Sequence, residues 1–582
     1  MNWGKQTCYL LLFLSLNSVF CVTDSPNEST NDPGNDVVIG TRSGYIRGVR
    51  MPTKTGFLVD YFKGVPFAEK PERLRKSQLV HRWPGIYRAQ SYPPKCIPVS
   101  RPANSSQFSE DCLYLNILKP SGLMQSPQPI DKYPVVVFIH GGGFQEGDGN
   151  DASCEAFAEN FVSKGMVVVT IQYRLAMQGF LSLGCTNPLI PCNIGLWDMV
   201  TAFKFINKTI GDFDGDVNNM TLMGHSAGAM AVSLHSISPI SSVYFKKYIQ
   251  LSASSWSLTR YRSQNIETTK KILHDLGCNV SSTKQIVECV NSTSLDSMYS
   301  AQIDTNLWPE FGDDLLPDIP DNLVRNTQNQ KVLMGVMTLE SLYFTYLKSS
   351  PAIFPFIQKS TVQEYINSTI AVQYGVNSDS AYEMLSEYYL SSNESENDYP
   401  YYMRQRTKID SNMVFDMPIL REARARSQIS SNLYLYHFSY FNAAEFDEGF
   451  PVQATYHCHE FPYIWGVYKD NYFVFNDDDR KVSEFLISSL TNFIITGDPS
   501  SSMLKWKLYD SDVSHTVIQP KPSIEKNLFQ SDFKFWNMMA QRFQFDLISG
   551  LSVDNNFETT TSKSSVVSVF LLLLSYIIIV LA

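Results

Sequence analysis

A series of short apolar runs, separated by stretches of helical pattern, constrains the fold of this chain more than any other feature. The runs are rich in β-branched residues and include "YPVVVFI" at 133–139, "GMVVVTIQY" at 165–173, "YIQLSAS" at 248–254 and "KVLMGVM" at 331–337. A helical pattern at 196–210 lies between two of them. Buried strands that alternate with helices predict an α/β fold with a large, mostly parallel, twisted central sheet flanked by helices. In such sheets, ligands bind at the carboxyl ends of the strands.

The globular pattern runs from residue 37 to residue 547 without a long linker or repeat, which predicts a single catalytic domain. Residues 22–36 are polar and contain Pro and Gly, and we interpret them as a disordered lead. Residues 1–21 begin with a basic segment and continue into an apolar run. That pattern is typical of a secretory signal peptide and is too short for a membrane-spanning helix.

The C-terminal segment predicts attachment to a membrane. Residues 548–565 form a polar spacer, and residues 566–582 are almost entirely apolar, with no Lys or Arg after them. A Ser/Thr-rich spacer before such a tail is typical of a GPI-attachment signal. The alternatives are a membrane anchor of marginal length and release without an anchor.

Outside the signal segment the chain has eight cysteines, and an even number favours disulfides in a secreted protein. Pairing by proximity predicts three bridges and leaves Cys154 with Cys458 as the remaining pair. The three predicted bridges are Cys96–Cys112, Cys185–Cys192 and Cys278–Cys289.

Asn-x-Ser/Thr triplets support the same extracellular interpretation. A further triplet begins at Asn219, but it lies close to the apolar run that precedes Ser226. The predicted glycosylation sites are Asn27, Asn104, Asn207, Asn279, Asn291, Asn367 and Asn393.

The stretch "GHSAG" at 224–228 follows an apolar run and precedes a helical pattern. In that context Gly-x-Ser-x-Gly indicates a nucleophile elbow, where a sharp turn lifts the serine above the sheet. The turn crowds backbone against backbone, so Gly224 and Gly228 relieve the clash. Ser226 is therefore the predicted nucleophile.

A second glycine-rich loop, "HGGGF" at 140–144, also follows an apolar run. Ester hydrolysis develops negative charge on the carbonyl oxygen, and backbone N–H groups aimed at that oxygen stabilise the transition state. We expect the oxyanion hole to consist of the N–H groups of Gly142, Gly143 and Ala227.

The histidine that serves as base must come from elsewhere in the chain. In α/β-hydrolases the order along the chain is Ser, then Asp or Glu, then His, which excludes His81 and His140. His225 adjoins Ser226 on a tight turn, where neighbouring side chains diverge. His235 lies one or two turns along the following helix. The richest candidate stretch is "ATYHCHEFPYIWG" at 454–466.

That stretch contains His-Cys-His, a pattern that also binds metals, but no third ligand is evident and we expect no metal site. The acid that orients the base should follow a buried strand. Glu340 does so, just past the run at 331–337. By the residues alone, it is one of several acids that meet this requirement.

Several stretches resemble the type-B carboxylesterase/cholinesterase-like family, which has the α/β-hydrolase fold. They are "FKGVPFAEKP" at 62–71, "SEDCLYLNI" at 109–117, "NIGLWD" at 193–198 and "TNFIITGDPSSSMLKWKLY" at 491–509. The resemblance extends from about Gly40 to Phe545. It includes the spacing of Cys278 and Cys289 and a bridge that ends at Cys112.

The resemblance implies a catalytic triad of Ser226, Glu340 and His457. "GVMTLES" is similar to the G-V-N-x-x-E stretch that carries the family's acid, and "HCHEFPYIWG" to the H-G-x-E stretch that begins with its base. Glu460 then matches the family's buried glutamate. Ser226 would form an acyl-enzyme, His457 would move the protons, and Glu340 would hold His457.

The chain differs from the family at four points, none of which removes a member of the triad. His225 stands where the family usually has glutamate or sometimes glutamine, and Cys458 and Ala253 stand where it has glycine. Cholinesterases carry a tryptophan in the loop that ends at the Cys112 position, and "CIPVSRPANSSQFSEDC" has none. Loss of an aromatic platform and a negative charge argues against a quaternary ammonium substrate.

The sequence therefore predicts an extracellular carboxylic-ester hydrolase that is not a typical cholinesterase. The alternative is a non-catalytic adhesion protein like the neuroligins, which use this fold to bind partners. We expect a small-molecule ester as partner, no cofactor, and a homodimer as in many family members. The net charge of −10 lacks the basic footprint that nucleic-acid binding requires.

Overall fold

The structure is a computed structural model that describes residues 35–100, 105–122, 131–150, 154–262, 264–278, 282–327, 330–347, 349–390, 393–429, 432–466 and 474–553. The predicted signal peptide (1–21), nearly all of the lead (22–36), most of the spacer (548–565) and the apolar tail (566–582) lie outside the described residues. Within the described ranges, no helix is both long enough and apolar enough to cross a membrane.

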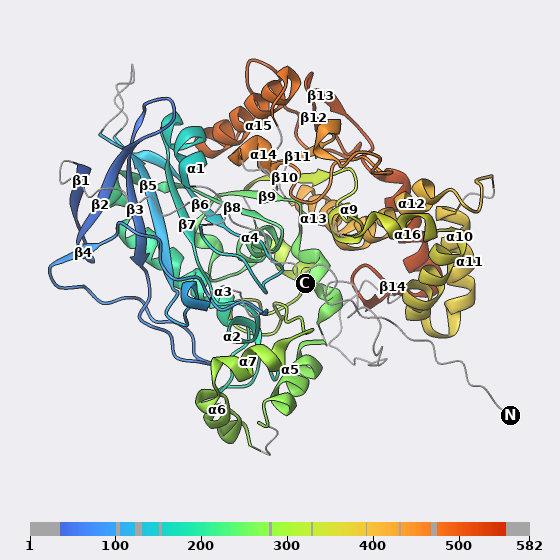
Figure 1. The fold of residues 1–582 in the computed structure, drawn as a ribbon, viewed down its shortest axis with the longest axis horizontal. Coiled ribbons are helices and arrows are strands. Elements are labelled where there is room, and N and C mark those ends of the chain that lie inside the picture. Colours follow the sequence, from blue (N-terminus) through green and yellow to red (C-terminus); the bar gives the residue numbers. More distant parts are fainter. Residues whose placement is uncertain are drawn as a thin grey trace.

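One large sheet crosses the molecule (Figure 1), in the order β1-β2-β3-β5-β7-β6-β8-β9-β10-β11-β12-β13, with β4 paired to β2. The strands are β1 (Asp36–Thr41), β2 (Gly44–Pro52), β3 (Leu58–Pro66), β4 (Ile86–Arg88), β5 (Tyr114–Pro120), β6 (Tyr133–Ile139), β7 (Val167–Ile171), β8 (Gly215–His225), β9 (Lys247–Leu251), β10 (Lys331–Met337), β11 (Leu433–Phe438), β12 (His515–Ile518) and β13 (Ser523–Glu525). A separate short hairpin joins β14 (Phe545–Asp546) to β15 (Leu551–Ser552).

The central strands of the sheet are parallel, as the sequence predicts. β7, β6, β8, β9, β10, β11 and β12 pair in parallel along this order. At one end of the sheet, β1, β2, β3, β5 and β7 pair antiparallel, and β13 closes the other end antiparallel. The sheet is thus mixed at its edges and parallel where ligands bind in such folds.

Alternating side chains of the central strands pack into two different apolar clusters, one on each face. Val135, Val137 and Ile139 of β6 belong to one cluster, whereas Val136 and Phe138 belong to the other. Successive side chains of a strand point to opposite faces of the sheet, so both faces of β6 are buried. Residues of α3 (Ile194–Thr209) and α4 (Ala227–Ile237) pack in the first cluster, and residues of α1 (Cys154–Asn160) and α15 (Asp477–Thr496) in the second.

The helices flank this sheet (Figure 1), and the helix expected at 196–210 is α3. The helices are α1 (Cys154–Asn160), α2 (Ala176–Phe180), α3 (Ile194–Thr209), α4 (Ala227–Ile237), α5 (Gln264–Asp275), α6 (Thr283–Ser292), α7 (Leu295–Gln302), α8 (Pro320–Leu323), α9 (Leu342–Thr345), α10 (Lys359–Tyr365), α11 (Ser378–Tyr389), α12 (Tyr399–Ser411), α13 (Met417–Ser427), α14 (Phe461–Trp465), α15 (Asp477–Thr496) and α16 (Gln530–Phe543). In Figure 1, α5, α6 and α7 form a lobe at the bottom, and α10, α11 and α12 lie at the right.

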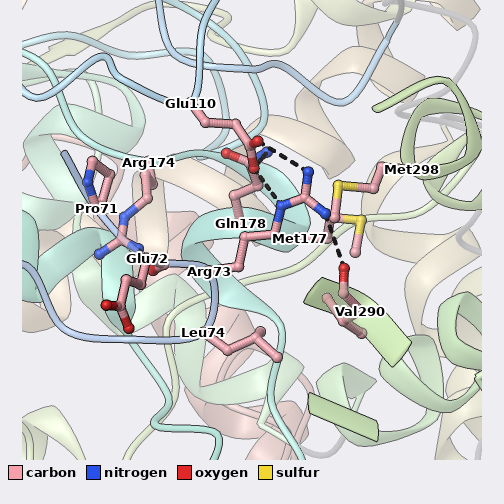
Figure 2. Close-up of a pocket in the computed structure, with 10 residues that line it drawn as sticks. All are labelled: Pro71, Glu72, Arg73, Leu74, Glu110, Arg174, Met177, Gln178, Val290 and Met298. Carbon is pink, nitrogen blue, oxygen red and sulfur yellow. Dashed lines mark hydrogen bonds and ion pairs between the residues drawn. The ribbon is translucent and has the colours of Figure 1, made fainter. Parts of the chain in front are cut away.

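A narrow pocket lies between the segment after β3 and helices α2, α6 and α7 (Figure 2). Its space is about 10 Å³, close to the minimum that one water molecule needs. Arg73 donates two hydrogen bonds to Glu110, at 2.5 and 2.9 Å, and one to the carbonyl oxygen of Val290 at 2.9 Å. Arg73 thus links the motif at 109–117 to α6. We interpret its role as structural, and we assign no ligand to this pocket.

All three predicted disulfides are present, namely Cys96–Cys112, Cys185–Cys192 and Cys278–Cys289. The expectation that Cys154 pairs with Cys458 is wrong, since neither forms a disulfide. Cys154 begins α1 and is buried in the apolar cluster beside Phe157. Cys458 instead lies close to the side chains of His225 and His457.

Four of the predicted glycosylation sites belong to the described residues, and all four are exposed: Asn207, Asn291, Asn367 and Asn393. Asn27, Asn104 and Asn279 lie outside the described residues. The Asn219 side chain accepts a hydrogen bond from Lys247 and donates one to the carbonyl oxygen of Ile495 at 3.2 Å. Glycosylation at the exposed positions remains a prediction.

Candidate active site

Ser226 occupies the sharp turn between β8 and α4. Its backbone has φ 56° and ψ −126°, a conformation that non-glycine residues rarely adopt. Its N–H donates to the carbonyl oxygen of Leu251 at 2.9 Å, and its own carbonyl accepts from the N–H of Met230 at 2.9 Å. Because these bonds anchor both sides of the turn, the strained serine is held at the carboxyl edge of the parallel strands.

The two glycines beside Ser226 are required by close backbone contact. A Cβ atom on Gly224 would lie 2.4 Å from the backbone of Gly228, and one on Gly228 would lie 2.2 Å from the carbonyl oxygen of Ile139. Both distances are far below van der Waals contact. The clash expected from the sequence is therefore real, and it also brings the start of α4 against the end of β6.

Glu340 and His457 form a buried hydrogen-bonded pair near the end of β10. The Nδ1 atom of His457 lies 2.8 Å from Oε2 of Glu340, and the N–H of Met337 donates to Oε1 at 2.9 Å. The backbone N–H of His457 also donates to the carbonyl oxygen of Glu340 at 3.1 Å. With the proton on Nδ1 facing the carboxylate, Nε2 carries a lone pair. Among the described residues, that Nε2 atom has no hydrogen-bond partner.

Aromatic rings surround the imidazole of His457. The ring centroids of His225, Phe415 and Phe344 lie 4.7, 4.9 and 5.1 Å from it. Phe461 lies 4.4 Å from the ring of His225. His225, whose side chain we expected to diverge from that of Ser226, packs beside the ring of His457. The sequence analysis did not identify Phe344 or Phe415, because neither belongs to a recognised motif.

His225 is neutral in this setting. Burial lowers the pKa of its imidazole well below the ordinary value, and the neighbouring His457 lowers it further. A protonated imidazole without a counter-charge in an apolar environment carries a large desolvation cost. The chain thus has a neutral ring where the family usually has a carboxylate.

The loop after β6 packs directly on the turn of Ser226. A Cβ atom on Gly141 would lie 3.0 Å from Cβ of Ser226 and 2.9 Å from the carbonyl oxygen of His225. Gly142 and Gly143 follow with φ of 101° and 63°, backbone conformations that favour glycine. Within the described part of the chain, no hydrogen bond uses the N–H of Gly142 or Gly143, nor that of Ala227.

Two further carboxyl groups are buried close to Glu340. Burial raises the pKa of Glu460 to about 8, with the charge of Glu340 as second cause, and its Oε1 lies 3.5 Å from Oγ of Ser252. Burial, again with Glu340 as second cause, raises the pKa of Asp416 well above its ordinary value. The resemblance anticipates Glu460. No sequence signal separates Asp416 from other acids.

The other histidines lie outside this arrangement. His459 is buried, with its Nε2 atom 2.9 Å from Oε2 of Glu445. His140 stacks on Tyr173 with ring centroids 4.4 Å apart. His235 is buried on α4, with Nδ1 2.9 Å from Oγ of Ser241, and burial lowers its pKa to about 3.

The low pKa of His235 predicts a loss of stability in acid. Its ordinary pKa is 6.5, so between pH 6.5 and 3 the unfolded chain binds a proton that the folded chain excludes. This single histidine then costs up to about 1.4 kcal/mol of stability for each unit that the pH falls below 6.5. We expect the midpoint of thermal unfolding of H235Q to fall less than that of the wild type between pH 6.5 and pH 5.

The matched control is H81Q, which replaces an exposed histidine. Differential scanning calorimetry at the two pH values measures both variants. Equal falls in the midpoint for H235Q and H81Q would contradict the prediction.

Each chemical group of the site follows the end of a central parallel strand. The glycine loop follows β6, Ser226 follows β8 and Glu340 follows β10. These strands run parallel and are linked through β9, so their carboxyl ends meet at one edge of the sheet. At the same edge, one ring nitrogen of His225, one of His457 and Sγ of Cys458 lie within 4.8 Å of one another.

Comparison with known proteins agrees with this arrangement over nearly the whole chain. The profile of the carboxylesterase family matches residues 35–536. Gut esterase 1 of Caenorhabditis briggsae is 30% identical over 561 residues, which cover 90% of this chain and 96% of that protein. Gut esterase 1 of Caenorhabditis elegans is 29% identical, covering 88% of this chain and 94% of that protein. Bile salt-activated lipase of Bos taurus is 29% identical, covering 88% and 89%.

The matched range contains every strand of the large sheet, together with Ser226, Glu340 and His457. A parallel sheet with a serine turn at its carboxyl edge is the architecture that the match implies. The chain therefore belongs to the carboxylesterase family and is a carboxylic ester hydrolase.

Proposed function

We propose that the protein hydrolyses carboxylic esters through an acyl-enzyme, with Ser226 as nucleophile, His457 as general base and Glu340 as its orienting acid. The observation that carries this proposal is the 2.8 Å bond between Nδ1 of His457 and Oε2 of Glu340. It leaves Nε2 as the only proton acceptor on the ring, in a buried site beside the turn of Ser226.

In the first half of the reaction, Nε2 of His457 accepts the hydroxyl proton as Oγ of Ser226 attacks the ester carbonyl carbon. The carbonyl oxygen becomes an oxyanion, which the N–H groups of Gly142, Gly143 and Ala227 stabilise. His457 then protonates the alkoxide leaving group, and the alcohol departs. Glu340 remains ionised and stabilises the imidazolium.

In the second half, water attacks the acyl carbon and gives a proton to Nε2 of His457. The second tetrahedral intermediate collapses, the proton passes to Oγ of Ser226, and the carboxylic acid leaves. No group outside the three side chains and the three N–H donors is needed for the atoms and charges to balance.

The surroundings of the triad favour uncharged esters. Phe344, Phe415 and the neutral His225 present rings to His457, and Phe461 packs on His225. An apolar surface of this kind binds acyl and alkyl groups through desolvation. A quaternary ammonium group gains nothing from a neutral imidazole in place of a carboxylate, so choline esters are expected to be poor substrates.

The non-catalytic adhesion alternative requires that the catalytic arrangement be dispensable. A strained serine, two glycines without room for a Cβ atom and a buried Glu–His pair are costly features for a protein that only binds. The hydrolase is therefore the function that we propose, with a homodimer as its expected assembly.

The proposed location is the cell surface, reached by the secretory route. Three disulfides form and persist in an oxidising compartment. Four sequon asparagines are exposed, as glycosylation requires. Attachment through a GPI signal at 566–582 remains part of the proposal.

Two measurements on the purified protein test the proposed mechanism together. We expect turnover of p-nitrophenyl acetate, and we expect a fluorophosphonate probe to label the protein once, on the peptide that contains Ser226. Heat-unfolded protein serves as the control, because labelling depends on the folded triad. Turnover without label on Ser226 would overturn the assignment of the nucleophile, and a folded protein with neither turnover nor label would favour adhesion.

A further inference from the structure

His225 has no role in the proposed reaction, yet it lies against the catalytic base. Its ring is 97% buried, and its Nε2 atom has no hydrogen-bond partner among the described residues. The Nε2 atom of His457 also has no hydrogen-bond partner among the described residues, and His457 is 98% buried. Both rings thus have a buried nitrogen without a partner, and their centroids lie 4.7 Å apart. A neutral imidazole has one nitrogen with a lone pair that a ligand can use.

Cys458 adds a thiol to the same region. One ring nitrogen of His225, one of His457 and Sγ of Cys458 all lie within 4.8 Å of one another. Cys458 has φ of 73°, a left-handed conformation that favours glycine, and glycine is the residue that the resembling family has there. A cysteine retained in a conformation that strains it suggests that its side chain, rather than its backbone, is what the site uses.

Two imidazole nitrogens and one thiolate are ligands for a borderline-soft divalent cation such as Zn²⁺ or Co²⁺, and not for Mg²⁺ or Ca²⁺. In a tetrahedral zinc site with bonds of about 2.0 Å to nitrogen and 2.3 Å to sulfur, the ligand atoms lie about 3.5 Å apart. Binding therefore requires these three atoms, which lie within 4.8 Å of one another, to reach that spacing. Ser226 and Cys458 are half-buried, so the cluster retains a route to solvent.

The Glu340–His457 bond strengthens this set of ligands. A histidine that binds a metal commonly donates its other ring N–H to a carboxylate, which fixes the tautomer and makes the ligating nitrogen more basic. The bond of 2.8 Å from Nδ1 to Glu340 does so here. His459, which the His-Cys-His pattern suggested as a second ligand, is instead beside Glu445. The third ligand that the local pattern lacked is His225, at the end of β8.

We propose that His225, His457 and Cys458 form an inhibitory site for a zinc-like divalent cation. On binding, the hydrated cation gives up water ligands to two nitrogens and one sulfur, the thiol of Cys458 releases its proton to solvent, and a water keeps the fourth position. The metal occupies the lone pair on Nε2 of His457 that otherwise accepts the proton of Ser226. The inhibition rests on the proposed function, whereas the binding does not.

A cobalt titration of the purified protein tests the binding by itself. We expect Co²⁺ to produce a thiolate-to-cobalt charge-transfer band at one equivalent, and Zn²⁺ to abolish the band. C458G should lose the band, and glycine suits the backbone at this position. H225Q, with a residue that the family also uses there, should bind Co²⁺ at least tenfold more weakly. C154S is the matched control and should keep the band, since it replaces the other described cysteine outside the disulfides.

A band that is absent from the wild type, or that persists in C458G, overturns the site. Equal affinity in H225Q and the wild type overturns it as well. Circular dichroism confirms that each variant is folded, and C458A provides a second thiol-free variant.

Zinc inhibition of ester hydrolysis tests the consequence. Each protein is compared with its own rate in chelated buffer, so differences in basal activity do not enter. We expect the zinc concentration for half inhibition to rise at least tenfold in C458G and in H225Q, and EDTA to restore the wild-type rate. An equal response in all variants overturns the inhibitory role. A cobalt band in a protein without esterase activity leaves the site intact and removes only the proposed function.

Discussion

S226A is expected to lower kcat/KM for p-nitrophenyl acetate by about 10⁴-fold or more. In the proposed mechanism, Oγ of Ser226 forms the covalent bond to the acyl group, and no other described hydroxyl occupies the strained turn between β8 and α4. Knocking out the serine of a serine hydrolase removes the acyl-enzyme route entirely, and the oxyanion donors alone retain only a small part of the rate enhancement. The loss should appear in kcat, because KM depends mainly on contacts that the substitution leaves in place.

Initial rates and a fluorophosphonate labelling assay measure this effect. S300A is the matched control, since Ser300 is an exposed serine on α7 whose hydroxyl donates only to the carbonyl oxygen of Asp296. It should retain wild-type rates. If folded S226A kept activity within tenfold of the wild type, Ser226 would not be the nucleophile.

E340Q is expected to lower kcat by about 10⁴-fold at neutral pH, with KM changed only a few-fold. The glutamine oxygen can accept the N–H of Met337, as Oε1 of Glu340 does at 2.9 Å. Its amide nitrogen then faces Nδ1 of His457 and donates to it. The imidazole proton must move to Nε2, so the ring presents a proton instead of a lone pair to Ser226. The variant therefore keeps the packing and loses the base.

Steady-state kinetics and thermal unfolding together separate this outcome from simple destabilisation. E288Q, a replacement of an exposed glutamate on α6, is the matched control and should behave as the wild type. If kcat of folded E340Q fell by less than a factor of ten, Glu340 would not set the tautomer of His457. A loss confined to KM would assign it to substrate binding.

The strands that carry the site were predictable because their sequences have little freedom. The runs at 133–139 and 331–337 coincide with β6 and β10, since β-branched residues bounded by glycines or polar turns favour buried strands. The turn of Ser226 was predictable because two glycines and a serine at that spacing meet a steric requirement of the backbone. The three disulfides followed from short separations along the chain.

The antiparallel pairing of β3 with β5 and of β5 with β7 was not predictable in this way. Another strand, β4 or β6, lies between the members of each pair in the chain, so no short connection sets the direction of pairing. The pairing of Cys154 with Cys458 failed for a related reason. Elimination among cysteines assumes that every thiol is bridged, whereas Cys154 packs in an apolar cluster and Cys458 lies by the site.

The sequence by itself predicted the central parallel strands, the sharp serine turn and, through resemblance, a catalytic triad of Ser226, Glu340 and His457. Local sterics and strand propensity act over a few residues, so they can be inferred from the sequence without knowledge of the tertiary structure. Only the tertiary structure decided what surrounds His457. The rings of His225, Phe344 and Phe415 come from separate segments, and their proximity to His457 arises from packing across the ends of parallel strands, which no local pattern encodes. The same packing places His225 near Cys458, the residue that follows His457 in the chain.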